Sequence, residues 1–492
     1  MRTDSSKELR KNIGDNVNTD QKTLPESKNK DSEPIMIHRA KMPIHHAGHD
    51  KGATDTASEN AWKAKVGGDP LFDAFPDGIV THPGVSARPV APEDKDAFLE
   101  NLLAKPREQK SAAYIHIPYC ETRCLYCMFY NKPYRNAEES KIFTDHLIRE
   151  IDLWSDKAVM TGRPIRTVYF GGGTPTALEA NDIARLLKAV REKLPLANDA
   201  EITYEGRLSN FGTDRMDACI EGGVNRFSLG VQTFDTKVRQ AVGRRSDKDE
   251  LISQLQKLMS YDEAAVVIDL IYGFPYQTME TWEEDLRIAR ELNLDGVDCY
   301  QLRVFPGSPL HKYIANGKLP AGPDHRTMAE MFRRSVEIME DAQWDRISIT
   351  HWANNPRERN LYNYFAKTRT DVLSFGPGAG GNIAGNAYMI ERNVAEWMKQ
   401  VAEGKKPVAM IMAPHKLWQL HKAVSEHMEL NRLNPKALEK EFALPVTAIW
   451  APILENWVEA GLMTQRGDFY LLTVAGQFWQ TRLIQLLLNQ IK

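Results

Sequence analysis

The sequence predicts an α/β fold, a partial (βα)6-type barrel with an N-terminal extension and a C-terminal, mostly helical, winged-helix-like domain. Three observations predict it. Short apolar runs alternate with amphipathic stretches between residues 112 and 385, a pattern typical of parallel strands joined by crossover helices. Glycines, cysteines and carboxylates directly follow the apolar runs. Residues 405–492 read as helices, a hairpin and a last amphipathic helix.

Two segments precede the barrel. Residues 1–66 are rich in charged and small polar residues with little apolar periodicity, so we expect a disordered tail. Its four histidines could be metal or haem-iron ligands, but a solvated flexible segment explains them more simply: they are His38, His45, His46 and His49. Residues 67–111 are apolar but proline-rich, and we expect an extended segment that wraps the next domain.

The barrel itself is predicted over residues 112–385. Its predicted strands are Tyr114–Pro118, Thr167–Gly171, Glu201–Glu205, Arg226–Leu229, Val266–Ile271 and Val297–Leu302, with Arg346–Thr350 as a seventh candidate. Predicted helices are Glu138–Trp154, Asn181–Leu194, Thr278–Leu292 and Arg326–Asp341. In such a barrel the chemistry lies at the carboxyl ends of the strands.

A connecting helix is predicted over residues 386–404, before the winged-helix-like domain of residues 405–492. Winged helices often bind DNA, but the basic excess here is slight, and we expect a lid or packing role instead.

Composition excludes several classes of function. The net charge is −3, so no basic field recruits nucleic acid. No apolar run approaches the ~20 residues that cross a bilayer. The charged N-terminus is not typical of a secretory signal, so we expect no membrane association and a cytoplasmic location.

The chain has five cysteines, and three of them lie within eight positions as Cys120, Cys124 and Cys127. Thiolates at this spacing can hold an iron–sulfur cluster, and three ligands on four irons leave one iron open. Zinc and a chance grouping are alternatives. A structural zinc site needs four ligands, however, and no second cysteine pair is present. His116 alternates with apolar residues in a predicted strand, which argues against it as the fourth ligand.

Polar residues and glycines end the next predicted strands. Gly171–Pro175 follows the second, where glycines let the backbone approach a ligand. Glu205, Gln232 and Asp269 end the third, fourth and fifth. Each alone could be a turn or a helix cap. Together at one barrel mouth they predict a ligand site.

These motifs resemble the radical S-adenosylmethionine (radical SAM) superfamily, in the branch of oxygen-independent coproporphyrinogen oxidase and its haem-chaperone relatives. The matching segments are Tyr114–Cys127, Gly171–Thr176, Gly230–Asp235, Ile268–Pro275 and Phe375–Gly380. Within that branch the chain most resembles the anaerobic haem-degrading methyltransferases, the anaerobilin synthases. That likeness includes Cys-Glu-Thr-x-Cys-Leu-x-Cys and the lead-in segments Pro70–Pro76 and Val80–Gly84.

The resemblance implies a role for each matching residue. Cys120, Cys124 and Cys127 would hold a [4Fe–4S] cluster whose open iron binds S-adenosylmethionine. Residues expected to contact this cofactor are Tyr114, Gly172, Gly173, Thr174, Glu205, Gln232, Arg244 and Asp269. Tyr126 matches an aromatic position that contacts a second S-adenosylmethionine molecule.

One position departs from the oxidase pattern. Phe129 stands where the oxidases have a further cysteine. This difference argues against an oxidase and is compatible with both the chaperones and the haem-degrading group. The latter implies that haem is the substrate and is opened and methylated with release of iron. It also implies a flavodoxin-type electron donor. Haem propionates need cations. Arg303 is the first candidate, and Arg346, Arg357 and Arg359 are further candidates. Each of them could equally be an ordinary surface arginine.

Overall fold

A computed structural model describes residues 61–76 and 87–491 of the chain. The four tail histidines and Val80–Gly84 lie outside these residues. The prediction of a disordered tail through residue 66 is wrong for its last residues. Trp62 and Ala64 are hydrogen-bonded to helix α15 (Val446–Glu459). No described helix is long and apolar enough to span a membrane.

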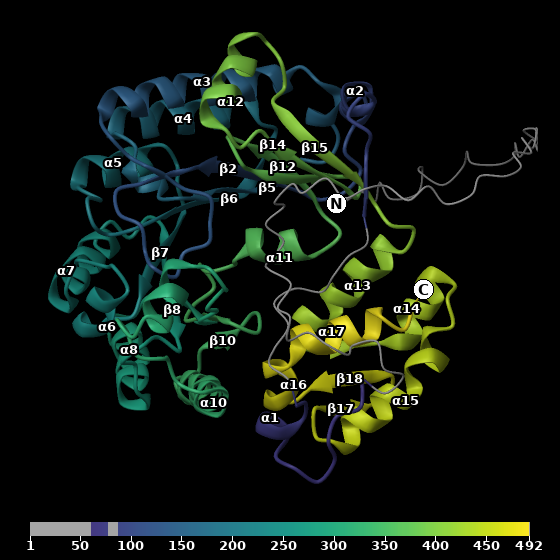
Figure 1. The fold of residues 1–492 in the computed structure, drawn as a ribbon. Coiled ribbons are helices and arrows are strands. Elements are labelled where there is room, and N and C mark those ends of the chain that lie inside the picture. Colours follow the sequence, from purple (N-terminus) through teal and green to yellow (C-terminus); the bar gives the residue numbers. More distant parts are fainter. Residues whose placement is uncertain (1–60, 77–86, 492) are drawn as a thin grey trace, which may run out of the picture. The chain divides into compact units, whose positions relative to one another are not determined.

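A thirteen-stranded sheet forms the main body, and its central strands are parallel (Figure 1). In order across the sheet these are β12 (Asp371–Phe375), β2 (Ser111–Ile117), β5 (Ile165–Gly172), β6 (Leu196–Gly206), β7 (Arg226–Gln232), β8 (Ala265–Tyr272) and β9 (Gly296–Gln301). The six predicted βα strands are confirmed, and their order in the sheet follows the chain.

The predicted seventh strand is wrong. Residues 347–350 form a turn, closed by the bond from Ile347 N to His351 O. The flanking strands β10 (Asp345–Arg346) and β11 (His351–Ala353) therefore run antiparallel, and β11 pairs with β9. The seventh parallel strand is instead β12, which pairs with β2 at the other side of the sheet.

Antiparallel strands extend the β12 edge. They are β13 (Gly380–Ile383), β14 (Asn386–Ile390), β15 (Val408–Ala413) and the short β1 (Arg88–Pro89). The predicted connecting helix of residues 386–404 thus begins with a strand, and the helix there is α12 (Val394–Ala402). The segment before the barrel is not wholly extended, since it contains α1 (Pro70–Asp73) and α2 (Lys95–Leu103). The proposed domain boundaries stay a prediction.

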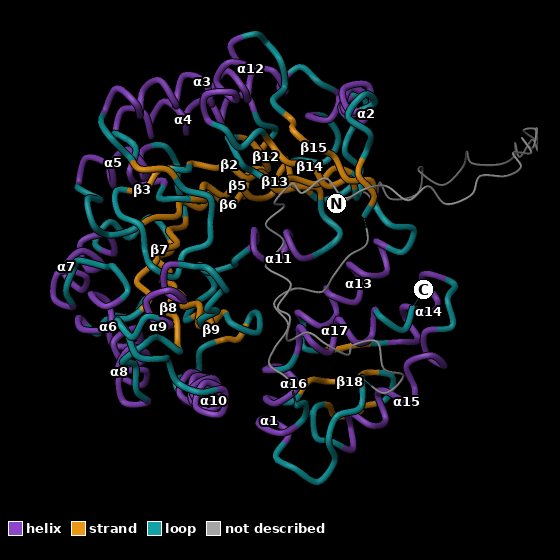
Figure 2. Tube along the Cα trace, in the orientation of Figure 1, coloured by secondary structure: helices purple, strands orange, loops and turns teal. Residues whose placement is uncertain are grey.

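Helices cover the outer face of the parallel strands, as Figure 2 shows. They are α3 (Ala137–Ser155), α4 (Ala180–Lys193), α5 (Thr213–Glu221), α7 (Lys248–Met259), α8 (Met279–Glu291) and α10 (His325–Asp341). The short helices α6 (Thr236–Ala241) and α9 (Pro309–Ala315) instead pack against the loop that carries Cys124 and Cys127, where Leu125 is bonded to Val242 and to Leu310. Outward side chains such as Phe170, Tyr204 and Phe227 are fully buried in the core. Because side chains alternate along a strand, their neighbours Tyr169, Glu205 and Ser228 point to the barrel interior. The interior therefore carries polar and aromatic side chains from several strands.

The C-terminal part has the helix–strand–helix–helix–hairpin order of a winged helix, as predicted. Its elements are α13 (Trp418–Glu429), β16 (Arg432–Leu433), α14 (Pro435–Phe442), α15, β17 (Met463–Arg466), β18 (Phe469–Leu472), α16 (Val474–Phe478) and α17 (Gln480–Leu488). Helix α15, the third helix of the motif, contains no Lys or Arg. The indole N–H of Trp457 on this helix donates to Trp62 O at 2.9 Å. These contacts favour a packing role for the domain over nucleic-acid binding.

Candidate functional site

The cysteine loop leaves the carboxyl end of β2 and is closed at its base. Strand β3 (Tyr119–Cys120) pairs with β4 (Lys132–Pro133), and the amide of Lys132 donates to Pro118 O at 2.7 Å. Inside the loop, the amide of Leu125 donates to Val242 O at 3.1 Å, which attaches the loop to the end of α6. The three thiols are free and are held at the barrel mouth.

No three His, Cys, Asp or Glu side chains of residues 61–76 and 87–491 converge on a single metal-ion position. A four-iron cluster binds each of its thiolates at a different iron, and three thiols carried by one loop are the donor type that such a cluster takes.

Several polar side chains contact the cysteines. The hydroxyl oxygen of Thr174 lies 3.4 Å from Cys120 Sγ, and Arg207 Nη2 donates to Cys124 Sγ at 3.3 Å. Burial raises the pKa of Cys120 and of Cys127. Burial also acts to raise the pKa of Cys124, but the nearby Arg244 and Arg207 guanidinium groups outweigh it and lower that pKa.

The glycine loop after β5 is packed too tightly for a side chain. A Cβ on Gly172, whose φ is +115°, would lie 2.6 Å from the His116 ring. A Cβ on Gly173 would lie 2.6 Å from the backbone of Pro118. The amide of Gly172 donates to Glu205 Oε2 at 3.3 Å, so the ends of β5 and β6 meet as predicted.

Two carboxyl groups in the interior have raised pKa values. Burial, together with the charge of Asp269, raises the pKa of Glu205 to about 8. Burial and the charge of Asp298 raise the pKa of Asp269 to about 7. Perturbed carboxyl groups in a barrel mouth are typical of functional sites, because a bound cation can ionise them.

Aromatic rings cover the interior face of β2 and β5. Tyr114 lies 5.7 Å from Tyr362 and 6.3 Å from Tyr169, measured between ring centroids. Tyr362 belongs to α11 (Leu361–Lys367), which packs inside the barrel against these strands. The sequence prediction missed both α11 and its tyrosine.

Gln232 and Arg244 adjoin the cysteine loop from the β7 side. Gln232 has a φ of +76°, which is rare for a side-chain-bearing residue. Its amide oxygen is buried without a hydrogen-bond partner among the described residues. Arg244 donates from Nε and Nη2 to the Tyr126 hydroxyl, at 3.3 and 3.2 Å, and from Nη1 to Gly230 O at 2.5 Å. An orphaned buried oxygen beside a guanidinium is suited to a ligand that carries both a donor and an acceptor.

The candidate haem-propionate cations divide between the two ends of the barrel. Arg303 follows β9 at the mouth and is half-buried, and burial lowers its pKa. Arg346 stacks on Trp352 and donates to Ile349 O at 2.7 Å.

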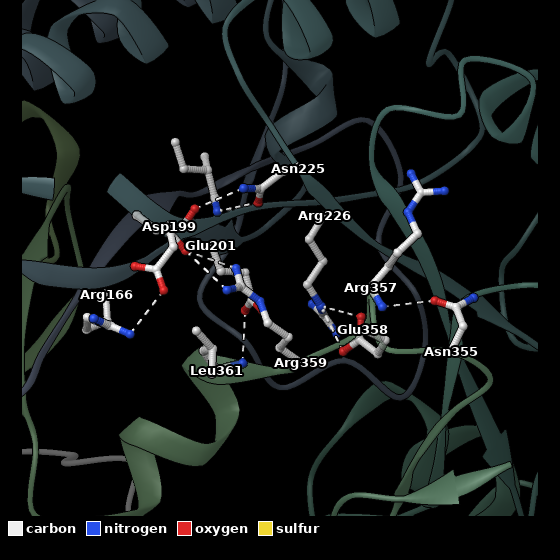
Figure 3. A network of polar contacts seen from close by, with 12 residues as sticks. Arg166, Asp199, Glu201, Asn225, Arg226, Asn355, Arg357, Glu358, Arg359 and Leu361 are labelled. Carbon is white, nitrogen blue, oxygen red and sulfur yellow. Dashed lines mark hydrogen bonds and ion pairs between the residues drawn. The ribbon is translucent and has the colours of Figure 1, made fainter. Parts of the chain in front are cut away.

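Arg357 and Arg359 contact residues near the beginnings of the strands, which is the end of the barrel opposite the mouth; Figure 3 shows both arginines beside Glu358. Arg357 donates to Asp262, which precedes β8, at 2.6 Å. Arg359 donates to the carbonyl oxygen of Asp199, in the first half of β6, at 3.2 Å. Between them Glu358 pairs with Arg226, the first residue of β7, at 2.9 Å. Both arginines, named above as further candidates for propionate binding, are thus held away from the mouth by an ion pair and by a carbonyl oxygen.

The sequence prediction also missed Arg207. A polar residue just after a predicted strand was the available signal, but spacing alone does not show that it reaches a cysteine in another loop.

Residues 114–289 match the model of the radical SAM superfamily. The chain is 41% identical to anaerobilin synthase of Escherichia coli O157:H7, over 84% of this chain and 91% of that protein. It is 27% identical to the heme chaperone HemW of Escherichia coli K12, over 77% and 98%. The solved structure of coproporphyrinogen III oxidase (HemN) from Escherichia coli superposes with a TM-score of 0.68 at 23% identity, covering 80% of this chain and 92% of that one. This last likeness shows a shared fold.

Proposed function

This chain belongs to the radical SAM superfamily and to the family of anaerobilin synthase, and from that premise we propose that it opens the haem macrocycle anaerobically. In this proposal it is a methyltransferase that releases iron and a methylated linear tetrapyrrole. The identity to anaerobilin synthase over 91% of that protein is the observation that carries the proposal.

Radical SAM proteins use a [4Fe–4S] cluster and S-adenosylmethionine. We propose that Cys120, Cys124 and Cys127 bind the cluster. When bound, the two groups together supply radical chemistry, by one-electron cleavage of the cofactor's sulfonium. The free, mouth-facing thiols and the contact of Thr174 with Cys120 support this assignment.

The chain's own residues would bind and orient the cofactor. The unpaired amide oxygen of Gln232 can accept a hydrogen bond from it. Glu205 and Asp269, with pKa values of about 8 and about 7, would ionise against its ammonium group or accept from its ribose hydroxyls. Only glycine fits at positions 172 and 173, where the loop packs on His116 and Pro118, and in this proposal the cofactor's amino end lies beside that loop. The tyrosines on β2, β5 and α11 would exclude water from the barrel interior.

The proposal uses two S-adenosylmethionine molecules, with Tyr126 contacting the second. Its hydroxyl lies against Arg244 and its ring centroid is 5.1 Å from that of Phe274, so it faces both a cation and an apolar wall. We propose that haem binds at this mouth, with Arg303 near its propionates, and that a flavodoxin-type protein supplies the electrons. The reaction would take place in the cytoplasm, where thiols stay reduced.

The test is anaerobic incubation of the reconstituted protein with haem, a reductant and S-adenosylmethionine labelled on its methyl group. We expect the Soret band to disappear and a linear tetrapyrrole carrying the label to form. A Cys124→Ala variant and a reaction without reductant serve as controls. Haem that stays intact and bound to the protein would instead support a haem chaperone, as the likeness to HemW suggests. Carbon dioxide released from coproporphyrinogen would support the oxidase reading.

A further inference from the structure

The backbone of Arg207 is held in a defined position just beyond β6. The Thr176 hydroxyl accepts from the amide of Arg207 at 3.2 Å and donates to its carbonyl oxygen at 3.3 Å. A Cβ on the preceding Gly206 would lie 2.2 Å from the Thr176 side chain, so the strand end packs closely on this threonine. These contacts therefore fix the backbone position from which the Arg207 side chain extends.

The guanidinium of Arg207 reaches across to the cysteine loop. Nη1 donates to the carbonyl oxygen of Thr122 at 3.0 Å and to its hydroxyl at 2.9 Å. Nη2 donates to Cys124 Sγ at 3.3 Å. Cys124 is almost fully buried, with 1% of its surface exposed. A planar fork is suited to bridging two acceptors in this way, whereas a lysine ammonium is a single point of charge.

We propose that Arg207 is a positioning residue for the cluster and raises its reduction potential. This inference rests on the proposed function, since it assumes that Cys124 is a cluster ligand. A cluster becomes more negative when it is reduced, and a hydrogen bond to a ligating sulfur together with a nearby positive charge stabilises that state. The same contacts hold the loop between Cys120 and Cys124 at Thr122.

Substitution of Arg207 distinguishes two possible roles of this residue, ordering the loop and changing the reduction potential of the cluster. A residue that only orders the loop would change how much cluster is bound, and would leave the potential of the bound cluster unchanged. The reduction potential is therefore the informative measurement. It is followed by EPR during a redox titration without haem, so it does not depend on turnover.

The variants are Arg207→Gln, Arg207→Lys and the control Arg166→Gln. Arg166 lies near the start of β5 and pairs with Asp199 at 3.1 Å, so its loss changes net charge equally at the other end of the barrel (Figure 3). We expect R207Q to shift the potential negatively by an amount that lowers the reduced-to-oxidised ratio about tenfold, which is about 59 mV for one electron. R207K should fall between R207Q and the unsubstituted protein, and R166Q should not shift.

An R207Q potential equal to that of the unsubstituted protein would overturn the inference. If R207Q binds no cluster, the potential of R207K is the test. A potential lower than that of the unsubstituted protein supports the inference, and an equal potential overturns it. Absence of any cluster signal from the unsubstituted protein would refute the proposed function itself, which separates the two failures.

Discussion

The guanidinium of Arg244 donates two hydrogen bonds to the hydroxyl of Tyr126, from Nε at 3.3 Å and from Nη2 at 3.2 Å. This contact joins the cysteine loop to the segment after α6, two parts of the chain that are 118 positions apart. Arg244 is expected to contact the first S-adenosylmethionine molecule and Tyr126 the second, so residues of the two expected cofactor sites touch each other. Either residue can therefore affect both binding events.

Removing the hydroxyl should weaken cofactor binding while leaving the cluster in place. In Tyr126→Phe the buried Arg244 loses the one hydroxyl oxygen that accepts two of its hydrogen bonds, and a hydrogen bond to a charged group contributes about 1.5–3 kcal/mol. We expect S-adenosylmethionine affinity to fall by about tenfold or more, measured by equilibrium dialysis with labelled cofactor at unchanged iron content. Tyr261→Phe, which removes a hydroxyl bonded to Asp217 at 2.5 Å, is the control. Equal affinities of the two variants would contradict the assignment.

Cofactor affinity should depend on pH through Glu205. Burial, with the charge of Asp269, raises the Glu205 pKa from 4.5 to about 8, so the carboxyl group is mostly protonated at neutral pH. A cationic ammonium favours the ionised form, hence affinity should rise between about pH 6 and about pH 8 and then level. Glu205→Gln cannot ionise and should show weaker binding with a flatter profile. An unchanged profile in this variant would exclude Glu205 as the cause.

The stability of the protein should show a separate pH effect from Glu150. This carboxylate accepts from Gly376 N at 2.8 Å and from the Trp397 indole at 2.9 Å, and burial raises its pKa to about 8. Because the folded-state pKa exceeds the ordinary value of 4.5, the stability contribution is greatest at low pH. It is lost as the pH rises toward about 8, by about 1.4 kcal/mol per pH unit.

Glu150→Gln removes that ionisation. Denaturant titrations at about pH 6 and about pH 8.5 should show a smaller loss of stability in the variant than in the unsubstituted protein. Glu192→Gln, at an exposed site on α4, should behave like the unsubstituted protein. An equal loss of stability between the two pH values in E150Q and in the unsubstituted protein would argue against a protonated Glu150.

The alternation of apolar runs with amphipathic stretches in the sequence is enough to predict the parallel part of the sheet. Strands such as β5 and β8 are largely buried, so most of their residues are apolar and they stand out in the sequence. Their carboxyl-end residues share one edge by geometry alone, which is why Glu205 was correctly expected to lie beside the glycine loop.

The remaining features depend on contacts between distant segments. Strand β12 spans only five residues, and β14 alternates exposed and buried positions at an edge, so neither has a strong apolar run. Residues 347–350 contain the apolar and hydroxyl residues of a strand but form a turn. Arg207 and Tyr362 reach the site from loops and an inner helix, and spacing in the sequence cannot reveal those partners.

The buried ion pair at the base of the barrel should contribute to stability without acting in the chemistry. Arg226 and Glu358 lie 2.9 Å apart with at most 2% of either side chain exposed (Figure 3). Glu358→Gln removes the carboxylate that pairs with Arg226 and with His351, and breaking such a buried pair costs about 3–5 kcal/mol. Urea unfolding of the ligand-free protein measures this loss. Arg357→Gln disrupts an exposed pair with Asp262 and should cost no more than about 1 kcal/mol. Similar losses in both variants would contradict the assignment of the buried pair as the structural one.

Haem binding should depend on Arg303 and be independent of Arg359. Arg303 lies at the mouth beyond β9, whereas Arg359 donates to Asp199 O at the opposite end of the barrel. A guanidinium bound to a propionate contributes about 1.5–3 kcal/mol, so Arg303→Gln should weaken haem binding by roughly tenfold to a hundredfold. Absorbance titration with haem, under anaerobic conditions and without S-adenosylmethionine, gives the two dissociation constants. Arg359→Gln is the matched control, since it removes the same charge and should bind haem like the unsubstituted protein. Weaker binding in R359Q than in R303Q would place the haem at the other end of the barrel.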